Sequence, residues 1–127
     1  MKTYDILVVD DEPEIAALYK AFLELLPYSF KVVTSGEKAI ELLKSVKFTV
    51  FILDIDLGYN AMTGVDLSIK IKDMQKDAKV YALTGHADVF DGFDPSIAGF
   101  DDVFSKPFGY KNLIILLKDI LGDRTCK

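Results

Sequence analysis

Hydrophobic runs and amphipathic segments alternate along the whole chain. Five runs are predominantly apolar, as in strands buried on both faces, and they cover residues 6–9, 30–33, 48–53, 79–83 and 103–104. Parallel strands of this kind need a long connection between them, which is usually a helix. The pattern therefore predicts an α/β domain whose parallel sheet is covered by helices on both faces.

The first and last helices are indicated by apolar residues at helical spacing. Pro13 is placed to open the first helix and Pro27 to close it, because proline fits the first turn but cannot continue a helix. Gly122 is placed to end the last helix. The apolar stripe of the first helix comprises Ile15, Leu18, Tyr19, Phe22, Leu25 and Leu26, and that of the last comprises Tyr110, Leu113, Ile114, Leu117, Ile120 and Leu121.

Two further helices rest on weaker signals. Thr34 followed three residues later by Glu37 has the spacing of a capping box, which predicts a helix through Val46. Residues 65–72 alternate with period two, which by itself indicates a strand. We predict a helix there because the segment joins two buried parallel strands. Its buried stripe would comprise Leu67, Ile71 and Met74.

The segment between the last two strands departs from this regularity. Residues 88–98 contain Gly92 and Pro95, which both disfavour the interior of a helix. We expect this fourth helix to be short, broken or absent, with three aromatic residues anchoring the loop: Phe90, Phe93 and Phe100. Together the elements predict a flavodoxin-like sandwich of three layers, with five parallel strands in the order 2-1-3-4-5.

Length and composition limit the class of protein. The 127 residues fit one domain, spanning 1–127, with no separate output domain. No apolar run approaches the ~20 residues of a membrane helix, and the first residues lack the form of a signal peptide. The net charge of −5 disfavours nonspecific nucleic-acid binding, and the single cysteine, Cys126, excludes an internal disulfide. We expect a cytoplasmic protein that binds neither membranes nor nucleic acids.

Polar residues gather where the predicted strands end. Ligands of open parallel sheets bind beyond the carboxyl ends of the strands, so these residues should meet in one cleft. Clustered carboxylates repel one another unless a cation binds among them, and an oxygen-lined site suits Mg²⁺. A carboxylate can also act as a nucleophile toward a phosphoryl group, assisted by a hydroxyl and an ammonium that neutralise charge. The residues at these ends are Asp10, Asp11, Asp54, Asp56, Thr84 and Lys106.

Four short motifs, each at a strand end and in this order, resemble those of response-regulator receiver domains. They are the Asp-Asp-Glu-Pro turn at 10–13, Val-Phe-Ile-Leu-Asp at 50–54, Ala-Leu-Thr-Gly at 82–85 and Lys-Pro-Phe at 106–108. The resemblance extends from end to end of the chain. It implies a signalling switch of a two-component or phosphorelay system, which takes a phosphoryl group from a histidine kinase or a histidine phosphotransfer protein. The switch then acts on a downstream protein that the sequence does not identify.

The resemblance also implies a metal site. Asp11 would bind Mg²⁺ directly and Asp10 would assist through water. Asp54 and the backbone carbonyl of Asp56 would complete the protein ligands. Mn²⁺ is expected to substitute for Mg²⁺ in this site.

The same resemblance assigns the phosphoryl chemistry. Asp54 would be the phosphoacceptor. Thr84 would hydrogen-bond one phosphoryl oxygen and Lys106 would pair with another, while the peptide bond from Lys106 to Pro107 is expected to be cis. The domain would catalyse its own phosphorylation and dephosphorylation, without turning over an external substrate.

The sequence departs from the family pattern near the switch. The loop at 55–64 lacks the usual proline and is longer, and Asp56 adds a carboxyl group. The switch position, usually aromatic, is Val103, and strand alternation points the adjacent Phe104 to the opposite face. These changes put the family's standard output mechanism in doubt. We further hypothesise that Asp56 and His86, each two residues beyond a site residue, set the dephosphorylation rate.

Purely structural interpretations remain open for single residues. The acidic residues at 10–12 could merely favour the N-terminus of the first helix through its dipole. Taken alone, Asp54 could be a turn residue and Lys106 a solvated surface lysine. Asp56 and His86 could both be solvated loop residues, and His86 lacks the cysteine or histidine companions of a metal site.

Two other functions are consistent with parts of the sequence. Asp54-Ile55-Asp56 after a buried strand resembles the nucleophile motif of haloacid-dehalogenase-type phosphatases. That family places its motif near the N-terminus of a longer chain, and it would leave Asp10 and Asp11 unexplained. A degenerate receiver, binding a partner without being phosphorylated, is the second alternative, although the complete acidic cluster argues against it.

Overall fold

The computed structural model describes residues 2–54, 64–84, 99–105 and 109–123. In these ranges the chain alternates strands with helices, as the hydrophobic pattern predicted. The strands are β1 (Lys2–Val9), β2 (Phe30–Val33), β3 (Val46–Asp54), β4 (Lys79–Thr84) and β5 (Asp102–Ser105). The helices are α1 (Pro13–Glu24), α2 (Gly36–Leu43), α3 (Gly64–Met74) and α4 (Tyr110–Leu121).

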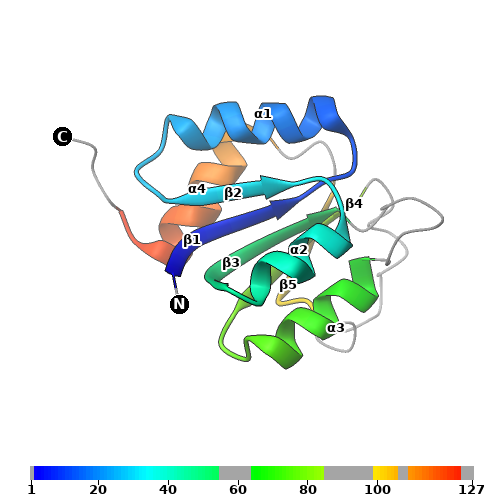
Figure 1. Cartoon of the computed structure of the whole chain (residues 1–127). Coiled ribbons are helices and arrows are strands. Elements are labelled where there is room, and N and C mark those ends of the chain that lie inside the picture. The colour runs from blue at the N-terminus through cyan, green and yellow to red at the C-terminus, as the bar shows by residue number, and fades with distance from the viewer. Residues whose placement is uncertain (1, 55–63, 85–98, 106–108, 124–127) are drawn as a thin grey trace.

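The five strands form one parallel sheet in the order β2-β1-β3-β4-β5. This confirms the predicted flavodoxin-like topology. β3 is the longest strand, and it lies at the centre between β1 and β4 (Figure 1). Because all strands point the same way, their carboxyl ends lie along one edge of the sheet.

Two hydrophobic cores separate the sheet from its helices. α2 and α3 cover one face, where Leu43 and Leu67 pack with the β3 residue Phe51. α1 and α4 cover the other face, where Leu23 and Leu113 pack with residues of β1 and β3 (Figure 1). Alternate residues of the central strands therefore enter opposite cores, which is why these strands are apolar almost throughout.

The first helix follows the predicted pattern except at its exposed side. Pro13 is its first residue, and Tyr19 and Leu23 are buried as expected of its inner face. Leu18 and Leu25 were assigned to the apolar stripe, but their side chains are 47% and 71% exposed. The stripe is narrower than predicted because Leu25 lies beyond the helix, which ends at Glu24, and Leu18 lies on the exposed side of the helix.

The prediction for α2 is wrong in its N-cap residue and in the length of the helix. Ser35, not Thr34, is the N-cap, and its hydroxyl accepts a hydrogen bond of 3.1 Å from the Lys38 backbone N–H. The helix ends at Leu43 instead of continuing through Val46, which is already the first residue of β3. Backbone hydrogen bonds of the tighter three-residue type close this last turn.

Residues 65–72 lie within the helix α3, so the requirement for a connector outweighed the alternating pattern. Leu67 and Ile71 are fully buried, as predicted. Met74 is not, since 41% of it is exposed. The neighbouring Gln75 is the buried residue at this end of the helix, and its role is polar rather than hydrophobic.

Gln75 joins the end of α3 to the beginning of the central strand. Its Oε1 accepts a hydrogen bond of 3.0 Å from the Phe48 N–H, and its Nε2 donates one of 2.9 Å to the Val46 carbonyl. The side chain thus satisfies two backbone groups at the start of β3 in a buried position. A buried amide with both ends paired is stable, whereas removal of the amide would leave both backbone groups without partners.

In β5, Val103 and Phe104 point to opposite faces of the sheet, as strand alternation predicted. Val103 packs against the core under α2 and α3, and Phe104 packs against the opposite core. Phe100 is buried, as its anchoring role predicted. The expected short or broken helix at 88–98, with Phe90 and Phe93, lies outside the described residues.

Within the described part of the chain, no helix has both the length and the apolarity that crossing a membrane requires.

We predict that Gln75→Ala destabilises the domain by about 2–3 kcal/mol, because it leaves a buried N–H and a buried carbonyl unpaired. Urea unfolding followed by circular dichroism measures this change. The adjacent exposed variant Lys76→Ala should stay within about 0.5 kcal/mol of wild type. Equal stability of the two variants would show that the Gln75 hydrogen bonds contribute nothing.

Candidate functional site

Three buried polar residues mark the carboxyl edge of the sheet. Asp10 directly follows β1, and Asp54 and Thr84 are the last residues of β3 and β4. Their exposed fractions are only 2%, 3% and 1%, respectively. Acidic and polar side chains are rarely buried to this extent without a specific role. The structure therefore brings these three predicted site residues to the same edge.

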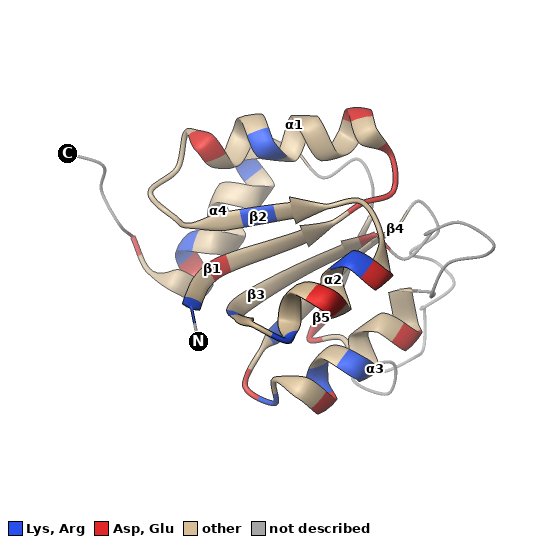
Figure 2. Cartoon of the chain, in the orientation of Figure 1, with Lys and Arg blue, Asp and Glu red and all other residues tan. Residues whose placement is uncertain are grey.

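The pairing of β1 with β3 brings two of the carboxylates together. Val9 lies opposite Leu53 in the parallel register, so the next residues, Asp10 and Asp54, leave neighbouring strands at the same level. Asp11 follows in the turn that joins β1 to α1, and it is half-buried. Figure 2 shows acidic residues along this turn, at the edge where the central strands end.

Asp10, Asp11 and Asp54 form an acidic cluster. Each offers a carboxylate oxygen, and the three oxygens all lie within 4.8 Å of one another. Like charges at such distances repel, and burial reduces the screening by water. A divalent cation would remove the repulsion, and an all-oxygen donor set is the one that Mg²⁺ prefers. The residues present therefore fit the predicted magnesium site.

Two hydrogen bonds of Asp10 hold the turn after β1. The Asp10 N–H donates a hydrogen bond of 3.1 Å to the Val33 carbonyl, which continues the β1–β2 pairing by one residue. The Asp10 Oδ1 accepts one of 3.0 Å from the Glu12 N–H, just before α1 begins at Pro13. Asp10 is thus fixed at both its backbone and its side chain. A structural role of these acidic residues at the start of α1 is therefore compatible with a role in metal binding.

Tyr19 is electrostatically linked to the cluster, which the sequence analysis missed. Burial raises the pKa of its phenol well above the usual 10.0, and the negative charges of Asp10 and Asp54 raise it further. The phenol therefore stays neutral to a higher pH than an exposed tyrosine does. In the sequence, Tyr19 is simply one member of the apolar stripe predicted for the first helix. Its position there does not indicate that a charged group lies nearby.

The remaining predicted residues lie outside the described part of the chain. Asp56 and His86 fall in the undescribed segments 55–63 and 85–98, and Lys106 and Pro107 fall in 106–108. In sequence, Lys106 follows Ser105, which is the last residue of β5 and pairs with Thr84. The roles assigned to these four residues stay predictions.

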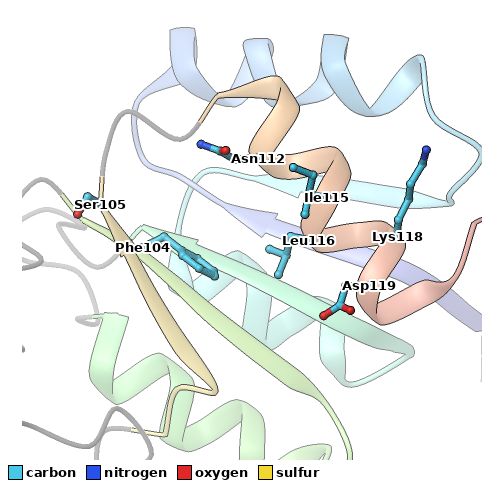
Figure 3. Close-up of a pocket in the computed structure, with 7 residues that line it drawn as sticks. All are labelled: Phe104, Ser105, Asn112, Ile115, Leu116, Lys118 and Asp119. Atoms are coloured by element: carbon cyan, nitrogen blue, oxygen red, sulfur yellow. The ribbon is translucent and has the colours of Figure 1, made fainter.

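A cavity of about 790 Å³ lies between β5 and α4 (Figure 3). In Figure 3 the Phe104 ring extends from β5 toward the helix, where Ile115 and Leu116 lie. β4 separates β5 from β3 in the sheet, so this cavity is distinct from the acidic cluster. The remaining lining residues are Ser105, Asn112, Lys118 and Asp119.

Comparison with known proteins agrees with this arrangement. The family described as the response regulator receiver domain matches residues 6–118. The match covers every described strand except the first residues of β1, and it includes the whole acidic cluster. The chain belongs to the response regulator receiver family, the switch domains of two-component signalling.

Particular relatives share this domain. The chain is 30% identical over 117 residues to the response regulator SaeR of Staphylococcus epidermidis, which covers 92% of this chain and 50% of SaeR. It is 27% identical to the transcriptional regulatory protein SrrA of Staphylococcus aureus, covering 92% of this chain and 47% of SrrA. The chain thus spans about half the length of these curated relatives.

Solved structures share the fold over nearly the whole chain. The response regulator TrrA of Thermotoga maritima, crystallised with Mg²⁺–BeF, has a TM-score of 0.77 and 32% identity, covering 94% of this chain and 99% of TrrA. A receiver domain protein of Methanospirillum hungatei has a TM-score of 0.80 and 25% identity, covering 94% of this chain and 92% of that one.

We predict that Mg²⁺ binds at the acidic cluster and that Asp11→Ala weakens its binding by more than about tenfold, since even indirect partners of metal ligands are worth ~10–100-fold. Isothermal titration calorimetry measures the affinity. Glu24→Ala, which removes a carboxylate from the far end of α1, should bind as wild type does. Unchanged affinity in Asp11→Ala would place the metal elsewhere.

Proposed function

We propose that Asp54 accepts a phosphoryl group from a phosphohistidine of a histidine kinase or histidine phosphotransfer protein, in a reaction that requires Mg²⁺. The observation that carries the proposal is the acidic cluster, in which Asp54 ends the central strand beside Asp10 and Asp11. Family membership supports the same chemistry. In this proposal the protein is a switch that catalyses its own phosphorylation and dephosphorylation.

In the transfer step, a carboxylate oxygen of Asp54 attacks the phosphorus atom of the phosphohistidine. The new P–O bond forms as the P–N bond breaks, and the electron pair of that bond returns to the imidazole nitrogen. Such a transfer depends on positioning and on neutralisation of charge more than on covalent chemistry by the protein. Asp54 is suited to the role because its strand, paired on both sides, holds it rigidly.

The other site residues have supporting roles in this proposal. Asp10, Asp11, Asp54 and the backbone carbonyl of Asp56 would hold the metal, Mg²⁺ or Mn²⁺, which when bound neutralises charge on the phosphoryl oxygens. Thr84, buried at the end of β4, donates a hydrogen bond to one phosphoryl oxygen. Lys106 pairs with another.

The alternatives are less well supported. A haloacid-dehalogenase-type phosphatase would not need Asp10 and Asp11, which the structure brings to Asp54. A receiver that is never phosphorylated would not need a buried acceptor within a complete acidic cluster. The crystallisation of TrrA with Mg²⁺–BeF also supports a metal-dependent site in this family. Phosphotransfer profiling against candidate kinases would identify the cognate kinase.

We predict that a small acyl phosphate or a phosphorylated kinase domain, with Mg²⁺, adds one phosphoryl group to the protein. Asp54→Asn should abolish the labelling, because an amide is a poor nucleophile. Asp73→Asn, an exposed acid on α3, should be labelled as wild type is. Intact-protein mass spectrometry measures the added mass. Labelling of Asp54→Asn at the wild-type rate would assign the acceptor to another residue.

We also propose that Asp56 and His86 control how long the phosphoryl group persists. Each follows a site residue by two positions. A carboxylate there would repel the phosphoryl group or hold the hydrolytic water in line, and a histidine would block that water or change its charge with pH, since its unperturbed pKa is about 6.5. Asp56→Ala, His86→Ala and the double variant should therefore change the rate of phosphoryl loss. Decay of all three within about twofold of wild type, a barrier change below ~0.4 kcal/mol, would contradict this role.

A further inference from the structure

The strand that precedes Lys106 in the sequence has little support within the sheet. β5 has four residues and lies at the edge, where it pairs with β4 alone. Pairing begins at Tyr81 with Asp102 and ends at Thr84 with Ser105. Few backbone hydrogen bonds therefore define its register, and additional contacts must determine where its carboxyl end lies.

Asp101 supplies such contacts immediately before β5. Its backbone N–H donates a hydrogen bond of 2.7 Å to the Val80 carbonyl. Its side-chain Oδ2 accepts one of 2.7 Å from the Val80 N–H. Both backbone groups of Val80 are thus bonded to a single residue, which fixes the alignment of β5 with β4 before regular pairing begins.

Lys72 on α3 holds the Asp101 carboxylate in this position. Its Nζ lies 2.8 Å from the Asp101 Oδ2 and donates a second hydrogen bond of 2.6 Å to the Ala78 carbonyl. Partial burial would raise the pKa of Asp101, but the hydrogen bonds from Lys72 and Val80, with the charges of Lys72 and Lys79, lower it below 3.8. The carboxylate is therefore charged at neutral pH. Lys72 thus connects α3 with Ala78, just before β4, and with Asp101, just before β5.

Close packing of the preceding residues on α3 supports the same connection. Gly99 has a positive φ of 85°, and a Cβ atom there would lie 2.9 Å from the Ser68 Oγ. Phe100 is buried in the core that contains Leu67 and Ile71 of α3. Residues 99–101 therefore rest directly on the helix.

We propose that the Lys72–Asp101 ion pair is a positioning device for the chemistry at Asp54, because it sets the register of β5 and so fixes where its last residue, Ser105, lies beside Thr84. The inference rests on the proposed function, in which Lys106, the residue after Ser105, pairs with a phosphoryl oxygen. A slip of one residue would move the end of the strand by ~3.3 Å and turn its side chains to the opposite face. The described residues of the predicted metal site lie just after β1 and at the end of β3, so metal binding should not depend on this pair.

The test compares two measurements on the full chain carrying Lys72→Met. Its Mg²⁺ affinity should equal that of wild type, whereas its labelling rate with a small acyl phosphate should fall about tenfold, since a displacement of ~1 Å can cost ~100-fold in rate. Lys72→Arg should restore the rate, because it can keep the ion pair. Lys70→Met, an exposed lysine on the same helix, should change neither quantity. Asp101→Asn provides the comparison if Lys72→Met does not fold.

A double-mutant cycle separates positioning from general stability. If the ion pair acts through Lys106, Lys72→Met should slow labelling no further in a Lys106→Ala background. A wild-type rate in Lys72→Met, an equal loss of Mg²⁺ affinity and rate, or additive losses in the double variant would each overturn the positioning role. Failure of the wild-type protein itself to be labelled would instead refute the proposed function on which the inference rests.

Discussion

The parallel pairing of β1 with β3 is the constraint on which the site depends. Backbone hydrogen bonds hold the two strands in a register that ends at Val9 and Leu53. The residues that follow are both aspartates, and the sheet gives them no freedom to move apart. The hydrophobic residues of the two strands secure this register, because they fill the cores on both faces. Packing energy from apolar side chains thus offsets the repulsion between carboxylates.

This arrangement makes the site responsive to cations and to anionic groups. Charges in a poorly hydrated position interact strongly, so neutralisation by a metal ion changes the local energy more than it would at an exposed surface. Tyr19 adds no charge there, because a phenol is neutral near pH 7, and burial with the charges of Asp10 and Asp54 raises its pKa further. The electrostatic state of the site therefore depends on the carboxylates and on what binds them.

The sequence predicted the features that arise from repeating patterns. Apolar runs identified the strands and their order, and residues at strand ends identified Asp10, Asp11 and Asp54 as neighbours. It failed where the geometry of the folded backbone decided the outcome. Ser35 instead of Thr34 caps α2, since the local backbone selects one of two adjacent hydroxyls.

Polar contacts between residues far apart in the sequence were not predicted at all. Gln75 pairs with the start of β3 and Lys72 with Asp101, and neither contact has a local signature in the sequence. Hydrophobic periodicity reports which face of an element is buried, but it does not identify which backbone groups a long polar side chain reaches. The contributions of Asp56, His86 and Lys106 fall outside the described residues and stay predictions.

The lengths of the strands bear on how the protein behaves in concentrated solution. Both edge strands, β2 and β5, have four residues, against eight and nine in the central strands β1 and β3. A sheet edge exposes unpaired backbone groups that can recruit strands from other molecules, and a short edge offers few of them. Lys31 on β2 and Asp102 on β5 place an exposed charge on each edge strand. The extended, apolar strands that would aggregate most readily are thus enclosed, which protects the folded domain from self-association through its sheet.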